Sequence, residues 1–484
     1  MPVMRTGKIA ALLLLLVLPA AAQLVAPAPP IASPPVLIKN VNVVDPMGKV
    51  QENVSIEISG GRIAAIGKDL EEKKDYVVVD KQGKFVMPGL IDLRVQLGAS
   101  PGNRITRAEV GEEQRIEWLH SLLKMGVTTT RLIQGDLGEQ TDLQRWRDRA
   151  LLNSPAIVVS GPTFTTNDGI PTMDYGPLAI PTRIREVFEI QNDDQAMEKA
   201  RTVAHNGGNV FEIVFTAGPK SAEIPRLSEQ NLAVLTKEAH GHELKAFCWV
   251  AVNEEAQKAI ANGCDVLEGM SLETFNDTTL KTMADKHIAF LPAMVAQGYL
   301  LANYIKPDAM RQFVSEPLVQ NVLSPLMKKS LQADDGQIVR LRQSLPGGTK
   351  AAADDDSAQK FQDELTLQVA RVQENVRKAK ANGVSVVTGT SAGGVLDFPG
   401  ASEHQELELL VKNGFTPFEA LKSATQNAAA SIGRGDELGS VAVGKIADLV
   451  ILDANPLTDI RNAQKIDSVV RYGWVINLSD MYHY

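Results

Sequence analysis

The hydrophobic positions of this chain follow two different periodicities. Residues 36–88 alternate short apolar runs with turns, and Gly60-Gly61 is a strong hairpin signal. Residues 434–484 show the same pattern, with apolar runs at 447–453 and 468–476. Between them, from 89 to 433, apolar runs alternate with helical stretches, as in parallel sheets. The pattern therefore predicts an α/β fold with a small β-sandwich domain formed from both termini.

Eight apolar runs in the central stretch are candidates for parallel strands. They cover residues 90–97, 128–133, 156–160, 210–215, 244–250, 266–269, 288–292 and 385–389. Eight strand–helix units predict a (β/α)8 or TIM barrel, whose chemistry lies at the carboxyl ends of the strands. The long connection at 293–382 has helical composition and a loop-like segment at 346–358. It is either a lid over the barrel mouth or a helical excursion that only packs.

The amino-terminal segment predicts export. Arg5 and Lys8 precede an apolar run, and small residues at 20–22 follow it, so residues 1–22 resemble a signal peptide. The apolar run is short for a bilayer, which makes an uncleaved anchor the less favoured alternative. Residues 23–35 are rich in Pro and Ala and are interpreted as a linker. We expect a periplasmic or extracellular protein with no membrane span in the mature chain.

Charge and cysteine content narrow the partners and the redox chemistry. The net charge of −9 gives no indication of nucleic-acid binding. Only two cysteines occur, Cys248 and Cys264. Export allows a disulfide between them, but both fall in apparent core strands. We therefore expect buried free thiols.

One motif carries a family resemblance. Pro88-Gly-Leu-Ile-Asp92 resembles the first barrel strand of the amidohydrolase superfamily, in its imidazolonepropionase-like and prolidase-like branch. Further matching segments, among them the helix after His404, extend the resemblance over about residues 36–478. It implies a TIM barrel with a β-sandwich from both termini. It also implies metal-dependent hydrolysis of amide and related C–N bonds, in which metal activates water.

The family takes its metal ligands from six positions at strand ends, and this sequence departs from that pattern at five of them. The residues at the matching positions are Arg94, Gln96, Glu212, Trp249, Gly269 and Ser391. Divalent metals need deprotonated nitrogen and oxygen donors. Arginine has no acceptor and glutamine offers only a neutral amide oxygen, so Glu212 alone could still bind metal. The resemblance therefore predicts a barrel with no metal and no cofactor.

Two further residues are candidates for the pocket. His404 follows the eighth strand near the mouth, and Glu268 lies on the sixth strand. Charge balance predicts that Arg94 occupies the vacated metal position and pairs with Glu212, with Glu268 as a competing partner. The pair His240-Gly-His242 precedes the fifth strand, at the other face of the barrel, and is expected to be solvated.

These observations favour an exported, metal-free amidohydrolase relative that binds a small molecule or a protein partner. Homo-oligomerisation and pairing with an active relative are both compatible with the sequence. The alternative is an active amidohydrolase that acts on peptides, N-acyl amino acids or lactones through a residual or metal-independent site. A purely structural role, with the mouth filled by side chains, is the third hypothesis.

Overall fold

The computed structural model describes residues 31, 33–97, 111–171, 180–218, 224–296, 307–323, 355–393 and 397–478. The predicted signal peptide and most of the predicted linker lie outside these residues. The loop predicted at 346–358 lies outside them up to residue 354, and residues 355–358 already belong to helix α14 (Asp355–Ala381). No helix within the described ranges is both long and apolar enough to cross a bilayer.

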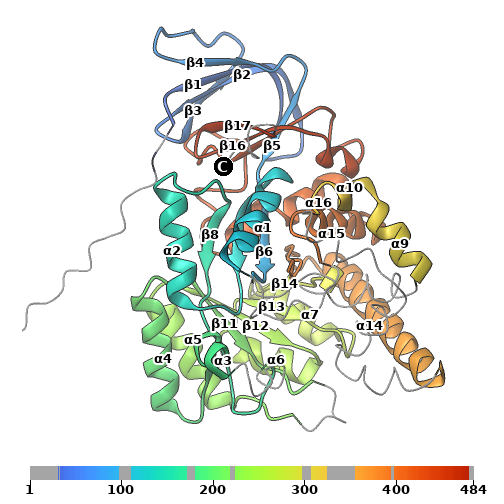
Figure 1. Cartoon of the computed structure of the whole chain (residues 1–484). Coiled ribbons are helices and arrows are strands. Elements are labelled where there is room, and N and C mark those ends of the chain that lie inside the picture. The colour runs from blue at the N-terminus through green and yellow to red at the C-terminus, as the bar shows by residue number, and fades with distance from the viewer. Residues whose placement is uncertain are drawn as a thin grey trace, which may run out of the picture.

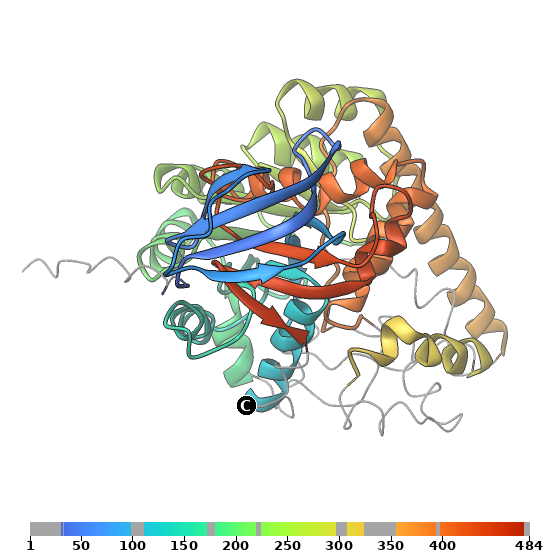
Figure 2. The same cartoon turned by 90° about the horizontal axis from the view of Figure 1, so that it is seen from above.

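Both ends of the chain join in one eight-stranded sheet, called here the terminal sheet (Figures 1 and 2). Its path is β17-β16-β15-β5-β1-β2-β3, and β4 pairs with β1 off this path. The strands are β1 (Val36–Val44), β2 (Val50–Ser59), β3 (Arg62–Gly67), β4 (Val77–Asp80), β5 (Phe85–Pro88), β15 (Leu449–Leu452), β16 (Ile466–Arg471) and β17 (Trp474–Asn477). The antiparallel pairing of β5 with β15 connects the two ends.

The terminal sheet differs from the predicted sandwich in being one hydrogen-bonded sheet. Its strand β1 has register irregularities after Ile38 and a positive φ of 60° at Asn40. Such bulges bend a strand. The first part of β1 pairs with β4 and the later part with β5, so the sheet divides at this strand. The predicted hairpin at Gly60 and Gly61 is present between β2 and β3, and both glycines have positive φ, as a tight two-residue turn requires.

The central stretch forms two parallel sheets below the terminal sheet (Figure 1). One has the order β6-β7-β8, with β6 (Leu90–Val95), β7 (Val127–Leu132) and β8 (Ala156–Val159). The other has the order β10-β9-β11-β12-β13-β14, with β9 (Thr163–Thr165), β10 (Val187–Glu189), β11 (Val210–Val214), β12 (Lys245–Val250), β13 (Val266–Gly269) and β14 (Ala289–Leu291). The short strands β9 and β10 were not predicted.

The predicted eighth strand is an irregular extended segment at residues 384–392. Single parallel bridges join Val386 to Phe290 on β14 and Ala392 to Val95 on β6. No regular ladder forms between these two bridges, and Ser391, next to the second one, adopts a positive φ of 58°. The segment therefore contacts both parallel sheets, one through each of its ends.

Helices alternate with the parallel strands and pack around them (Figure 1). They are α1 (Glu112–Lys124), α2 (Leu137–Asp148), α3 (Ile180–Glu186), α4 (Asp193–His205), α5 (Glu229–Gly241), α6 (Asn253–Ala261), α7 (Asp277–Asp285), α9 (Pro307–Ser315), α10 (Pro317–Gln320), α14, α15 (Ala401–Lys412), α16 (Pro417–Ser423) and α17 (Gln426–Ser431), with a 3-10 turn at Ile460–Gln464. A capping box begins α16 at Thr416, because its side chain and that of Glu419 satisfy each other's backbone N–H groups.

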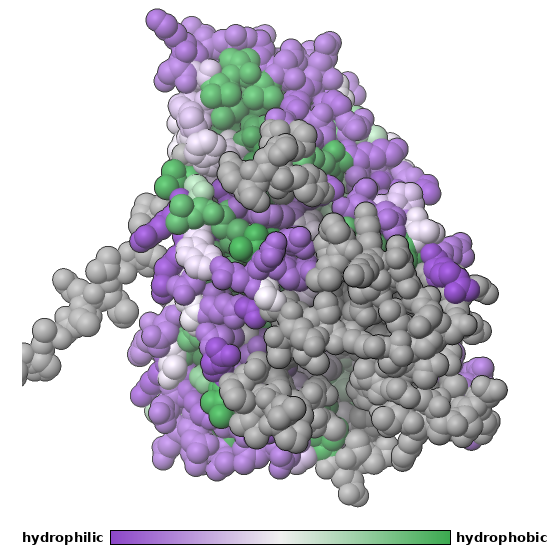
Figure 3. Space-filling model, viewed as in Figure 1, coloured by the Kyte–Doolittle hydropathy of each residue, from purple (hydrophilic) through white to green (hydrophobic). Residues whose placement is uncertain are grey.

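Alternate residues of the parallel strands point to an inner core. It contains Ile91, Leu93, Val158, Val210, Phe247, Val266, Leu291 and Val387. The residues between them pack outward with the helices in a larger cluster. Strand alternation thus separates an inner face, which ends at the candidate site, from an outer face. On the described part of the surface in Figure 3, side chains are mostly hydrophilic, with a hydrophobic patch on the terminal sheet.

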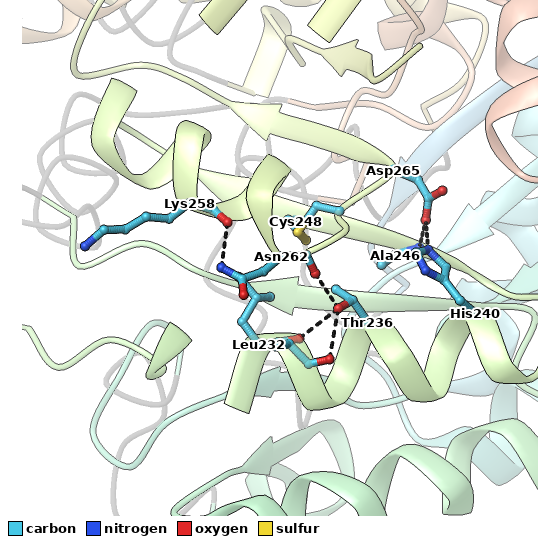
Figure 4. Close-up of a disulfide and its surroundings, with 10 residues drawn as sticks. Leu232, Thr236, His240, Ala246, Cys248, Lys258, Asn262 and Asp265 are labelled. Carbon is cyan, nitrogen blue, oxygen red and sulfur yellow. Dashed lines mark hydrogen bonds and ion pairs between the residues drawn. A yellow bond between two sulfur atoms is a disulfide. The ribbon is translucent and has the colours of Figure 1, made fainter. Parts of the chain in front are cut away.

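The prediction of two free thiols was wrong. Cys248 and Cys264 form a disulfide with a Cα–Cα distance of 6.0 Å (Figure 4). Cys248 lies on the outer face of β12, and α6 returns over that face before the chain reaches Cys264. Both residues are buried, as predicted. The fold places them close enough in space for their sulfurs to bond.

Candidate functional site

Four charged side chains meet inside the carboxyl ends of the parallel strands. They are Arg94 on β6, Arg131 on β7, Glu212 on β11 and Glu268 on β13, and we call them the ion cluster. All four are buried, with Arg131 fully inaccessible to solvent. Two buried arginines are thus held against two buried glutamates.

The two glutamates of the ion cluster are bound unequally. Glu268 accepts hydrogen bonds from both arginines, at 2.5 Å from Arg94 Nη1 and from Arg131 Nη2 at short range. Glu212 lies 3.6 Å from Arg94 Nη1 and 3.7 Å from Arg131 Nη1, too far for a hydrogen bond. The predicted pair of Arg94 with Glu212 is therefore present only as a loose contact, and Glu268 is the main partner.

Burial controls the charge of Glu212. It raises the pKa of the Glu212 carboxyl to about 7, against the guanidinium groups of Arg131 and Arg94, which act to lower it. The Oε2 atom of Glu212 and the Nη1 atom of Arg131 face each other without a hydrogen bond to any described residue. A polar group left without a hydrogen bond in a buried site is costly. The contact between these two atoms is therefore the least stabilising interaction of the ion cluster.

A bulge in β6 turns Arg94 toward the other charges. Between Asp92 and Val95 the strand gains a residue relative to β7. Because of this bulge, Arg94 follows Leu93 to the inner face instead of pointing outward. Arg94 is then held by Ser391, whose hydroxyl accepts from Nε at 2.7 Å, and by Trp249, whose ring lies 5.2 Å from the guanidinium carbon.

Asp92 anchors the strand end beneath Arg94. Its carboxylate accepts from the backbone N–H groups of Arg94 and Thr390, both at 3.1 Å, and from the Thr390 hydroxyl at 2.6 Å. Burial raises the pKa of Asp92 to about 6, although these hydrogen bonds act in the opposite direction. Asp92 thus ties β6 to the irregular eighth segment and fixes the position from which Arg94 projects.

Trp249 fills the space beside Gly269. A Cβ atom placed on Gly269 would lie 2.7 Å from the Trp249 ring, closer than any packed contact allows. Gly269 also has a φ of +93°, which disfavours other residues. A large indole and a residue without a side chain therefore occupy two neighbouring positions where the family resemblance implies two imidazoles.

Two predicted residues do not join the ion cluster. Gln96 lies beyond the end of β6, where its side chain faces Gln134 at 3.5 Å, because the bulge breaks the alternation that would pair it with Arg94. His404 is fully buried on α15, and its Nε2 atom lies 2.9 Å from the carbonyl oxygen of Met125. Met125 ends α1 two residues before β7 begins, so His404 lies near the amino end of that strand. Its assignment to the pocket was wrong.

Arg131 was missed by the sequence analysis although it is central to the ion cluster. It is the one charged residue in the strand Val127–Leu132, whose other positions are all apolar or threonine. Its Nε donates to the carbonyl of Leu93, and its guanidinium stacks 4.0 Å from the Phe247 ring. A lone arginine in a strand buried on both faces was the available signal, since such a charge requires buried partners.

The residues present do not fit a divalent metal ion. The positions that match family ligands provide a guanidinium, an indole, a hydroxyl already bonded to Arg94, and a glycine. The carboxylates nearby, those of Glu212 and Glu268, face Arg94 and Arg131. Nowhere in the described ranges do three His, Cys, Asp or Glu side chains gather in a way that could hold a metal. The donor set is therefore that of a salt-bridge network.

A mixed α/β chain with a charged site at the carboxyl ends of parallel strands has the layout of α/β proteins, including those built on barrels. The profile of the Amidohydrolase family matches residues 85–476, which is most of the chain. The chain belongs to the amidohydrolase family.

Individual relatives agree with this assignment. Imidazolonepropionase from Geobacillus sp. (strain WCH70) is 36% identical over 110 residues, which are 21% of this chain and 25% of that protein. The chain thus matches only about a quarter of that relative, and 15% of a dihydroorotase from Geotalea daltonii. Among solved structures, an Xaa-Pro dipeptidase with bound methionine has a TM-score of 0.70 at 20% identity, covering 92% of this chain and 100% of that one. A putative prolidase from Bifidobacterium longum has a TM-score of 0.68 at 22% identity, covering 92% and 95%.

Proposed function

We propose that this protein is an exported, metal-free member of the amidohydrolase family that binds a ligand without hydrolysing it. The ion cluster carries this proposal, because two guanidinium groups bond the carboxylate oxygens at the strand ends where the family resemblance implies metal. A metal would have to displace both arginines and would then meet one or two carboxylates and no imidazole. We further propose that the two parallel sheets and the segment at 384–392 form the (β/α)8 barrel, and that residues 36–88 and 434–484 form a separate domain.

Metal analysis of the purified protein tests the central proposal. Protein prepared without chelators is expected to contain far less than one equivalent of zinc, manganese, iron or nickel. The same preparation is expected to show no turnover of dipeptides, N-acyl amino acids or lactones above a denatured control. Near-stoichiometric metal together with turnover would refute the proposal.

A second candidate is a hydrolase that needs no metal or only one, as the name of the structurally similar Xaa-Pro dipeptidase suggests. The observation that favours it is the Glu212 carboxyl, whose pKa burial raises to about 7. A carboxyl that titrates near neutral pH suits general base catalysis. Turnover that disappears in Glu212→Gln and persists in the presence of a chelator would support this candidate over the first.

Export is proposed from the amino-terminal pattern and is supported by the disulfide between Cys248 and Cys264. Disulfides persist mainly in oxidising compartments. Expression of the full chain in a bacterial host, followed by mass spectrometry of the mature protein, is expected to find an amino terminus at Gln23 and two fewer hydrogens than the reduced chain. Retention of residues 1–22 on a cytosolic protein with two free thiols would contradict export.

A further inference from the structure

Two buried arginines share only one firmly bound carboxylate. Glu268 accepts from both guanidinium groups, one oxygen for each. Glu212 is the second carboxylate, but its oxygens remain 3.6 and 3.7 Å from the nearest guanidinium nitrogens. Arginine is always charged, so the ion cluster carries two fixed positive charges against one fully engaged negative charge. Its second negative charge is held loosely.

Two polar atoms of the ion cluster, one on Arg131 and one on Glu212, make no hydrogen bond within the described part of the structure. Arg131 Nη1 donates no hydrogen bond to any residue that the structure describes, and Glu212 Oε2 accepts none. Arg131 cannot move to improve this contact, because its Nε donates to Leu93, its Nη2 to Glu268, and its plane stacks on Phe247. A fixed, buried N–H without an acceptor is unfavourable unless another acceptor reaches it.

Arg94 is the least buried member of the ion cluster, with 7% of its surface exposed. Trp249 stacks on this guanidinium and is half-buried, so its indole contacts both a buried charge and solvent. Arg94 Nη1 and Arg131 Nη1 both face Glu212. An acceptor that entered past Trp249 would meet two guanidinium donors where Glu212 now makes no hydrogen bond.

We propose that the ion cluster is a binding site for the carboxylate group of a small organic acid, which takes the place of Glu212 between Arg94 and Arg131. Guanidinium groups bind carboxylates through paired, charge-assisted hydrogen bonds, which fits this class of ligand better than a spherical anion. Glu212 acts as the internal occupant of the site and is displaced when the ligand binds. This inference rests on the proposed metal-free function, since a bound metal would require the same space.

Acetate is the probe, and the full mature protein is tested after purification in carboxylate-free buffer. Calorimetric titration and thermal melting are compared for acetate and for chloride at equal ionic strength. Acetate is expected to bind and to raise the melting temperature, while chloride does neither. Glu212→Gln removes the competing charge and keeps the side-chain shape, so we expect its Kd for acetate to fall at least about tenfold, equivalent to ~1.4 kcal/mol.

Two variants complete the test. Arg94→Met is expected to abolish acetate binding. Glu374→Gln, which alters an exposed ion pair with Arg377 on α14, is the matched control and is expected to bind acetate as the wild type does. The inference is overturned if acetate acts no differently from chloride on both the wild type and Glu212→Gln, or if Glu212→Gln binds acetate no more tightly than Glu374→Gln. A metal-free protein that gives those results retains the proposed function and loses only this inference, whereas stoichiometric metal overturns the proposed function itself.

Discussion

Replacing Arg94 with methionine tests whether the ion cluster holds the strand ends together. Methionine fills similar volume but removes the bond from Nε to Ser391, the contact of Nη1 with Glu268, and the stacking on Trp249. Glu268 then keeps Arg131 as its charged partner among the described residues, and its carboxylate remains buried. Removing one member of a buried ion pair typically costs about 3–5 kcal/mol. We expect the Arg94→Met variant to lose stability in that range.

The measurement is urea unfolding followed by tryptophan fluorescence, combined in a cycle with Glu268→Gln. Because the two residues are in contact, the double variant is expected to lose less than the sum of the single losses, by about 0.5–3 kcal/mol. Arg201→Met is the control, since Arg201 forms an ion pair with Glu238 while its side chain remains 51% exposed. Exposed pairs contribute about 0.2–1 kcal/mol.

The reasoning would be refuted by a small effect at Arg94. If Arg94→Met loses less than about 1 kcal/mol, as expected of the exposed control, the pair is solvated and does not stabilise the strand ends. Additive losses in the cycle would also contradict the geometry, because they would mean that Arg94 and Glu268 act independently.

Four further predictions follow from the site and its surroundings. Micromolar Zn²⁺ is expected to leave the melting temperature unchanged, whereas a metal present at about 100 times its Kd would stabilise the fold by about 2.7 kcal/mol. Ser391→Asp is expected to create no metal-dependent turnover in amide hydrolysis assays, because its hydroxyl site faces Arg94. Gly269→Ala is expected to lower stability by about 1–3 kcal/mol in urea unfolding, since the new methyl group meets Trp249. Burial raises the pKa of Glu406 to about 8, so its contribution to stability is fully present below its unfolded pKa and is lost as pH rises through about 8. The urea midpoint is therefore expected to decrease as the pH is raised from 5 to 8, and to decrease less in Glu406→Gln.

The sequence predicts the parallel strands well because burial on both faces leaves nearly continuous apolar runs. Strands β11, β12 and β13 begin and end within one residue of the predicted ranges. The strands β9 and β10, each of three residues, were not found because so short a run has no clear periodicity. The eighth strand was predicted as regular over 385–389, but in the described structure this segment pairs only through a single bridge at Val386, a difference that the pattern of apolar residues does not report.

The candidate site was predicted in part. Arg94, Glu212, Glu268, Trp249 and Ser391 come together as expected, because each was placed at a strand end by its own motif. The preference of Arg94 for Glu268 could not be predicted, since a bulge of one residue decides where its side chain points. The disulfide was missed for a similar reason: pairing of two cysteines depends on how a helix returns over a strand, which spacing alone does not define.

The complementary packing of Trp249 and Gly269 has a consequence for how this protein can evolve. An imidazole introduced at position 269 would collide with the indole, and an imidazole introduced at position 249 would leave unfilled volume beside the glycine. Each single step toward a pair of imidazoles therefore lowers stability, and the positive φ at Gly269 adds a cost that a smaller residue at position 249 does not remove. The residues at positions 249 and 269 therefore constrain each other, and a change at either one is expected to affect the packing of the other.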